Sequence, residues 1–252
     1  MTVTRDVLHA PEPDGRGKSV DVYCPGTGSS PTPTVLLWHG TGPDERDVLG
    51  PLAKAVAREG VLVFVPDWRS DVSDAGRAHL LASLRFVRDR ADSYGGDADR
   101  TVLAGWSAGA GAAMGIALRP ELVDGWRPAG VVGIAGRYDL PARTTGADPL
   151  SDLVRTSAAP LPVRLVHGAS DAVLSHEHSR QFHRALHKYG WPAELAEPAT
   201  DHAGVIMATF DPRRGRCVPA QSEHALQAGR ETARIIAQAA VHGSPAAPRT
   251  AL

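Results

Sequence analysis

The stretch that most constrains the fold of this chain is TVLAGWSAGAGAAMG, residues 101–115. It begins with an apolar, β-branched run typical of a strand and continues into small residues that favour a helix. Between them lies Ser107, with Gly105 and Gly109 two residues away on either side. This pattern is typical of a nucleophile elbow, a strained strand-to-helix turn in which a Cβ at either glycine would collide with the backbone. The stretch therefore predicts an exposed, reactive serine at the end of a buried strand.

Apolar strands and amphipathic helices alternate along the rest of the chain. Apolar runs predict strands at 34–38, 61–65, 101–103, 131–135, 163–166 and 193–197, and helical periodicity predicts helices at 44–59, 74–94, 176–189 and 222–241. Residues 2–9 and 19–24 predict a hairpin. Strands without polar alternation are typical of a parallel sheet that is covered on both faces. We therefore expect an α/β fold with a mostly parallel central sheet flanked by helices on both faces.

The domain organisation follows from the absence of any linker or internal repeat in the sequence. We expect one domain over residues 1–242 and a C-terminal tail, residues 243–252, that has the composition of a disordered segment. The stretch between Asp139 and Leu161 is too short for a large lid. Residues 204–221 form an extra segment near the expected site, and the sequence does not indicate their role.

The charge balance and the hydropathy exclude several classes of protein. Lysine and arginine total 27 and aspartate and glutamate total 28, so a formal net charge of −1 argues against nucleic-acid binding. No apolar run approaches the roughly 20 residues that span a bilayer, and the N-terminus lacks the apolar segment of a signal peptide. We therefore expect a cytoplasmic protein without a membrane partner. Cys24 and Cys217 are too few for a disulfide framework, and we expect both to be thiols.

Candidate catalytic side chains follow the predicted strand ends, where such sheets bind ligands. A serine nucleophile needs a base within hydrogen-bond reach and a third group that orients this base. His202 follows the last predicted strand, and Asp171 follows the strand at 163–166. Asp139 is the alternative acid. The preferred set, Ser107, Asp171 and His202, has the order nucleophile, acid, histidine.

Several segments accompany these residues, namely VDVYCPG, LLWHGTG, REGVLVFVPDWR, RADSYGGDADRTVLAGWSAGAG, GVVGIAGRYDL, VHGASDAVLS and ATDHAG. With them the chain resembles the α/β-hydrolases over most of its length, and most closely their small esterase/lipase, carboxylesterase-like branch. The resemblance implies an oxyanion hole formed by the backbone N–H of Ala108 and that of Thr41 or Gly42. The choice between the last two stays open because the loop is HGTG where many relatives have HGGG. No cofactor or metal is implied.

The activity that the resemblance implies is hydrolysis of a small-molecule carboxylic ester through an acyl-enzyme intermediate. Ser107 would be the nucleophile, His202 the base and Asp171 the acid. Thioesters, formamides or other amides, and lactones are alternative substrates, because the same groups can cleave them. A ligand-binding protein without turnover is a second alternative, since a fold does not fix a function. The oligomeric state is not indicated.

Three aromatic residues are candidates for the wall of a substrate pocket: Trp68, Trp106 and Tyr138. Trp68 is the strongest of them because it lies just past a strand end. His39 and His167, each before a glycine at a strand end, are expected to hydrogen-bond the backbone of the loops that they begin.

A further group of histidines lies on one predicted helix, at positions 176, 178, 183 and 187. His183 and His187 have the i, i+4 spacing that can bind a metal ion. No thiol or other evident ligand completes a site, so a solvated helix face is the preferred interpretation.

Overall fold

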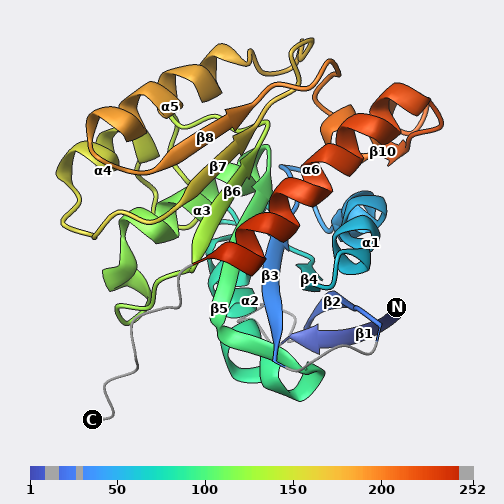
Figure 1. Ribbon diagram of the computed structural model, residues 1–252, viewed down its shortest axis with the longest axis horizontal. Coiled ribbons are helices and arrows are strands. Elements are labelled where there is room, and N and C mark those ends of the chain that lie inside the picture. Colours follow the sequence, from blue (N-terminus) through green and yellow to red (C-terminus); the bar gives the residue numbers. More distant parts are fainter. Residues whose placement is uncertain (9–16, 27–30, 244–252) are drawn as a thin grey trace.

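The computed structural model describes residues 1–8, 17–26 and 31–243. Within them the main sheet has eight strands: β1 (Thr2–Leu8), β2 (Lys18–Cys24), β3 (Thr32–Trp38), β4 (Leu62–Pro66), β5 (Gly96–Trp106), β6 (Gly130–Ile134), β7 (Val163–Val166) and β8 (Ala193–Ala196). Their order across the sheet is β1-β2-β4-β3-β5-β6-β7-β8 (Figure 1). Neighbours from β4 to β8 are parallel, whereas β1 and β2 form an antiparallel hairpin at one edge, as predicted.

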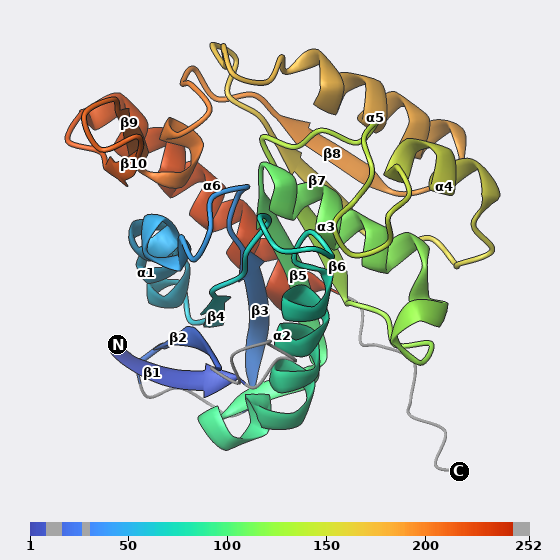
Figure 2. The same cartoon turned by 180° about the vertical axis from the view of Figure 1, so that it is seen from behind.

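Helices cover both faces of this sheet. α1 (Gly50–Arg58) and α6 (Glu223–His242) lie on one face, and α2 (Arg77–Arg90), α3 (Ala108–Leu118), α4 (Pro149–Arg155) and α5 (Glu177–Lys188) lie on the other (Figures 1 and 2). Side chains of β3 alternate between the two apolar layers: Val35 and Leu37 belong to the α1/α6 layer, and Leu36 and Trp38 belong to the opposite one. The predicted α/β fold with helices on both faces is confirmed.

The helix predicted at 44–59 is shorter in the structure. Residues 46–49 form a 3₁₀ turn, η1 (Arg46–Leu49), and the α-helix α1 begins only at Gly50. Asp44 has a φ of 53°, which a helix does not accommodate. Pro51 lies in the first turn of α1, where its fixed φ and missing N–H are suited to a helix start.

The helix predicted at 74–94 is also trimmed at both ends. Gly76 has a φ of 87°, so α2 starts at the next residue, and the Asp74 carboxylate accepts the N–H groups of Gly76 and Ala78. The C-terminal part continues as a 3₁₀ turn, η2 (Ala91–Tyr94). A separate short turn, η3 (Pro120–Val123), follows α3.

Residues 204–221 contain a hairpin that sequence analysis did not predict. A 3₁₀ turn, η4 (Gly204–Ile206), leads into β9 (Ala208–Asp211), which pairs antiparallel with β10 (Arg216–Pro219). The connecting residues 212–215 end at Gly215, whose φ is 64°. A four-residue, glycine-containing link between two short runs is a known hairpin signal, and it was available in the sequence.

Some predictions fall on parts of the chain that the structure does not describe. Of the predicted tail, only Gly243 is described, and most of the loop between β1 and β2 also lies outside the described residues. Cys24 and Cys217 are half-buried free thiols. Within the described ranges, no helix has both the length and the apolar character needed to cross a membrane.

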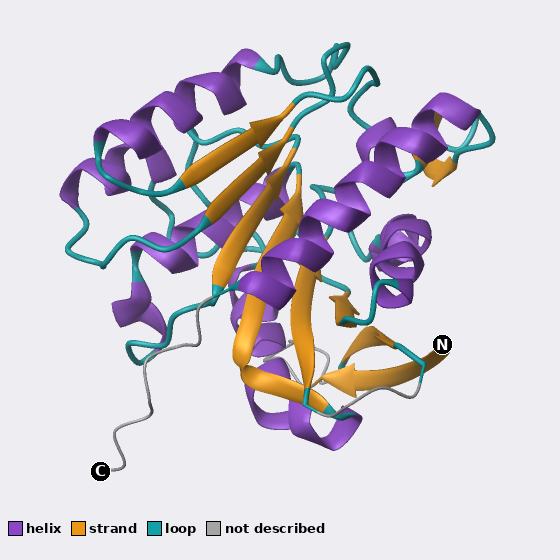
Figure 3. Ribbon diagram, in the orientation of Figure 1, coloured by secondary structure: helices purple, strands orange, loops and turns teal. Residues whose placement is uncertain are grey.

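The parallel strands bring their carboxyl ends to one edge of the sheet, which is the upper edge in Figure 3. The segments that follow β3, β5, β7 and β8 carry the predicted site residues, so the fold gathers them at this edge.

Candidate active site

Ser107 lies between the last residue of β5 and the first residue of α3. Its φ is 56° and its ψ is −117°, a conformation that costs a non-glycine residue about 1–3 kcal/mol. Its N–H donates to the Ile134 carbonyl at 2.8 Å, and its own carbonyl accepts the N–H of Ala110 at 3.1 Å. The surrounding backbone therefore holds the strained turn in place.

The flanking glycines are required because the start of α3 lies close to the backbones at the ends of β5 and β3. A Cβ at Gly105 would lie 2.1 Å from the carbonyl of Gly109, and a Cβ at Gly109 would lie 2.5 Å from the carbonyl oxygen of Trp38. Real Cβ atoms essentially never approach other atoms this closely. The steric argument made from the sequence thus agrees with the observed packing.

Asp171 and His202 meet beside this turn. His202 Nδ1 lies 2.7 Å from Asp171 Oδ2, and Asp171 Oδ1 accepts the N–H groups of Val173 and Leu174, each at 2.8 Å. Burial alone would raise the pKa of the Asp171 carboxyl, but the hydrogen bonds from His167, His202 and Leu174 more than offset it and hold this pKa well below its usual range. The carboxylate is therefore ionised at neutral pH.

His202 is held so that its second nitrogen is available. Because Nδ1 donates to the Asp171 carboxylate, Nε2 of the neutral ring is an acceptor. The Trp106 indole N–H donates to the His202 carbonyl at 2.9 Å, and the two rings lie 5.1 Å apart. Ser107 and His202 line the same cavity, although their side chains are not directly hydrogen-bonded in this ligand-free structure. Catalytic hydrogen bonds are often long before substrate binds.

His167 contacts the same carboxylate from the other side. Its Nε2 lies 3.1 Å from Asp171 Oδ2 and 2.9 Å from the Leu174 carbonyl, and its Nδ1 lies 2.7 Å from the hydroxyl of buried Ser179. The sequence predicted only the bond to the loop backbone. The contact with Asp171 was missed, because it depends on how the β7 loop folds back on itself.

His39 holds the loop that follows β3. It is fully buried, and its Nε2 accepts the N–H groups of Glu45 and Trp68 at 3.3 and 3.2 Å. Its Nδ1 donates to the Gly40 carbonyl at 3.0 Å, and burial lowers its pKa to about 3, so the ring stays neutral. The sequence-based interpretation of His39 as a loop-anchoring residue agrees with these bonds.

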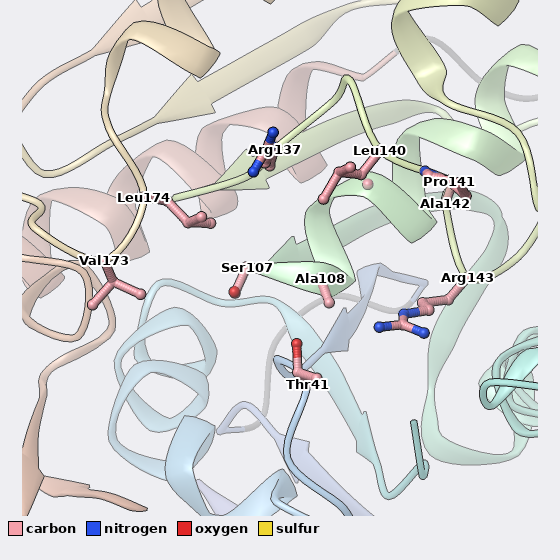
Figure 4. A pocket seen from close by; sticks show the side chains of 11 residues that line it. Thr41, Ser107, Ala108, Arg137, Leu140, Pro141, Ala142, Arg143, Val173 and Leu174 are labelled. Carbon is pink, nitrogen blue, oxygen red and sulfur yellow. The ribbon is translucent and has the colours of Figure 1, made fainter. Parts of the chain in front are cut away.

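The predicted oxyanion-hole residues border the serine. Thr41 and Ala108 line one cavity with Ser107, and Figure 4 shows them on neighbouring sides of it. In the described part of the chain, neither backbone N–H has a hydrogen-bond partner. The Ser70 hydroxyl donates to the Thr41 carbonyl and fixes this residue. Gly42 lines only a second cavity.

Two cavities adjoin Ser107 and share Thr41 and Val173. The smaller, about 280 Å³, extends past Ala108 and lies against α3 and the loop after β6. The larger, about 530 Å³, contains His202 and is walled by the β9–β10 hairpin through Phe210, whose exposed fraction is 58%. The hairpin thus forms part of the site.

Two of the three predicted pocket residues require correction. Trp106 lines the larger cavity as expected, but Trp68 and Tyr138 line neither of the two. Trp68 turns into the core and stacks on His39, with ring centroids 5.2 Å apart. Tyr138 is buried in the core and stacks on Phe182, with ring centroids 4.1 Å apart. Position past a strand end, the reason for choosing Trp68, did not determine where its side chain points.

Asp139, the alternative acid, and the two histidines with metal-binding spacing contact residues outside the predicted triad. Asp139 forms an ion pair with Arg137 at 2.8 Å and does not approach His202. His183 and His187 contact each other through their Nε2 atoms at 3.1 Å. Within the described residues, no group of three or more His, Cys, Asp or Glu side chains is arranged to hold a metal ion.

Comparison with known proteins decides the family. A family model of the alpha/beta hydrolase fold matches residues 52–245, more than half of the chain. The chain belongs to the α/β-hydrolase family. No curated protein matches its sequence.

Solved structures resemble this hydrolase over nearly its full length. Thermogutta terrifontis esterase 2, phosphoramylated by tabun, has a TM-score of 0.73 and 17% identity, with 97% of each chain covered. A thermostable esterase from Pseudomonas putida ECU1011 has a TM-score of 0.71 and 16% identity, covering 96% of this chain and 83% of that one. A putative dienelactone hydrolase from Klebsiella pneumoniae subsp. pneumoniae MGH 78578 has a TM-score of 0.66 and 22% identity, covering 95% and 99%. These likenesses support the fold.

Replacing Gly105 by alanine tests the packing of the elbow. The added Cβ would overlap the Gly109 carbonyl at 2.1 Å, so we expect a loss of more than about 3 kcal/mol in the free energy of unfolding, or no folded protein. Gly111→Ala is the matched control on α3, because its Cβ would meet only the Arg137 carbonyl, at 3.3 Å. We expect a change within about 1 kcal/mol for the control. Equal losses in urea denaturation would contradict the steric argument.

The buried His39 gives this hydrolase a pH-dependent stability. Its folded-state pKa of about 3 lies below the unfolded value of about 6.5, so between these pH values the unfolded chain binds more protons and stability falls as pH falls. In His39→Gln, the slope of unfolding free energy against pH between pH 6 and 4 should decrease by about 1.4 kcal/mol per unit. His224→Gln, at an exposed position on α6, should keep the wild-type slope. An unchanged slope in His39→Gln would show that His39 is not buried in the neutral form.

Proposed function

We propose that this protein is a serine hydrolase that cleaves a small carboxylic ester through an acyl-enzyme intermediate. The observation that carries the proposal is the 2.7 Å contact between Asp171 and His202, next to Ser107 on its strained turn. A nucleophile, a histidine and an orienting carboxylate at one sheet edge are the groups that this reaction needs.

The geometry supports the following sequence of steps. Ser107 Oγ attacks the carbonyl carbon while His202 Nε2 takes the hydroxyl proton, and the ionised Asp171 stabilises the resulting imidazolium. The backbone N–H groups of Ala108 and Thr41 receive the negative charge on the carbonyl oxygen. Collapse of this intermediate breaks the bond to the leaving oxygen, which takes the proton from His202. Water, deprotonated by His202, then attacks the acyl-enzyme carbonyl; the bond to Ser107 Oγ breaks, Oγ takes the proton back from His202, and the carboxylic acid is released.

The two cavities suggest how the ester would lie. His202 must reach the leaving oxygen, and it lines only the larger cavity. We therefore assign the alcohol to the larger cavity and the acyl group to the smaller one, beside Ala108. The same steps would apply to a thioester, an amide or a lactone. The esterases among the structural neighbours favour the ester.

A non-catalytic role has less support. A ligand-binding protein has no need for a strained serine or for a carboxylate shared by two histidines, and strain of this kind is retained mainly at functional sites.

Ser107→Ala tests the nucleophile. Wild-type protein mixed with p-nitrophenyl acetate should release a burst of about one equivalent of p-nitrophenol, followed by turnover. Ser107→Ala should lose the burst, and its kcat should fall by about 10⁵–10⁶-fold, to the level left by binding and the oxyanion hole. Full activity in this variant would contradict the assignment.

The two histidines on Asp171 allow a direct test of the base. His202→Ala should lose turnover to nearly the same degree as Ser107→Ala, because nucleophile and base act as a unit. His167→Gln should act mainly on stability and keep at least about a tenth of kcat, since its ring touches the carboxylate and not the serine. The reverse pattern, with His167 essential and His202 dispensable, would overturn the choice of base.

A further inference from the structure

The smaller cavity contains an arginine without a partner. Arg143 lies in the loop between β6 and α4 and is half-buried in the cavity wall. In the described part of the chain, its guanidinium forms no hydrogen bond or ion pair. Figure 4 shows this group directed toward the space beside Ala108 and Thr41.

The charge of this cavity is otherwise balanced. Its second arginine, Arg137, is paired with Asp139 through two contacts of 2.8 and 3.2 Å. No aspartate or glutamate lines the cavity among the described residues, whereas the larger cavity is lined by Glu45, Asp201 and Arg216. Among the described residues, Arg143 is therefore the unpaired charge of the smaller cavity, beside Ala108.

The backbone that carries Arg143 is fixed to the helix of the elbow. The buried Thr144 hydroxyl donates to the Ala112 carbonyl of α3 at 2.8 Å. The Ala142 N–H donates to the Ala147 carbonyl at 2.9 Å, and the Ala142 carbonyl accepts the Gly146 N–H at 2.8 Å. Because α3 begins directly after Ser107, these bonds fix the backbone of Arg143 relative to the nucleophile.

We propose that Arg143 binds a carboxylate on the acyl part of the substrate, so that the preferred ester is a half-ester of a short dicarboxylic acid. This inference rests on the proposed esterase function and on the assignment of the smaller cavity to the acyl group. A planar guanidinium binds a carboxylate through two parallel hydrogen bonds. The cavity volume of about 280 Å³ is at the lower end for ligand sites, which indicates a short acyl chain.

The test compares two nearly isosteric esters in a pH-stat assay. Ethyl hydrogen succinate carries the carboxylate, and ethyl 4-oxopentanoate replaces its charged oxygen by a methyl group. Wild-type kcat/KM should be at least about tenfold higher for the anionic ester. In Arg143→Gln this ratio should fall about tenfold, and in Arg143→Lys it should fall less, because the charge remains without the paired donors. Arg85→Gln, at an exposed position on α2, is the matched control and should keep the wild-type ratio.

A third ester locates the charge. This ester is 4-acetoxybutanoate, an acetate ester that carries its carboxylate on the alcohol side. Wild-type protein should not prefer it over the neutral ester, and a preference for it that Arg143→Gln abolishes would overturn the acyl-side assignment. A wild-type ratio near one, or an unchanged ratio in folded Arg143→Gln, would overturn the proposal while leaving the esterase function intact. Failure to hydrolyse all three esters and p-nitrophenyl acetate would instead contradict the proposed function itself.

Discussion

The start of α3 crosses the ends of β5 and β3 so closely that neither Gly105 nor Gly109 can carry a side chain, and this crossing is the constraint on which the rest of the site depends. It forces Ser107 into a positive φ and lifts its side chain out of the sheet edge. It also brings the first N–H groups of α3 next to the serine, where the N-terminus of a helix favours negative charge. The surrounding core must offset the strain, and α3 accordingly is almost entirely buried.

The remaining site residues are positioned relative to this crossing by the parallel sheet. Trp106, the last residue of β5, binds the backbone of His202 from the loop after β8. Asp171, after β7, is held by two backbone N–H groups and two histidine rings, so its carboxylate is both fixed and ionised. His39, after β3, fixes the loop of Thr41 with a neutral ring. The loops after β3, β5, β7 and β8 thus each position one part of the site.

The sequence predicted the features that depend on local geometry. The elbow was predictable because its glycines lie two residues on either side of Ser107. Asp171 and His202 were predictable because they lie in the loops that follow apolar strands. The sequence could not show that Trp68 turns inward onto His39, since a strand end does not fix where a side chain points. The contact of His167 with Asp171 and the place of Arg143 in a cavity depend on loops that fold back over distant elements. The β9–β10 hairpin was missed because its strands have only four residues each and bury a single residue, so they carry little apolar pattern beyond the glycine-containing turn.

The most direct test of the account is to identify the residue that a fluorophosphonate modifies. Ser107 is the only serine in the tryptic fragment 101–137, because the arginines within it precede proline. Mass spectrometry of the labelled wild-type protein should place about one phosphonyl group per chain on this fragment. Unlabelled protein, or a label confined to another fragment, would contradict the assignment of Ser107 as the nucleophile of this hydrolase.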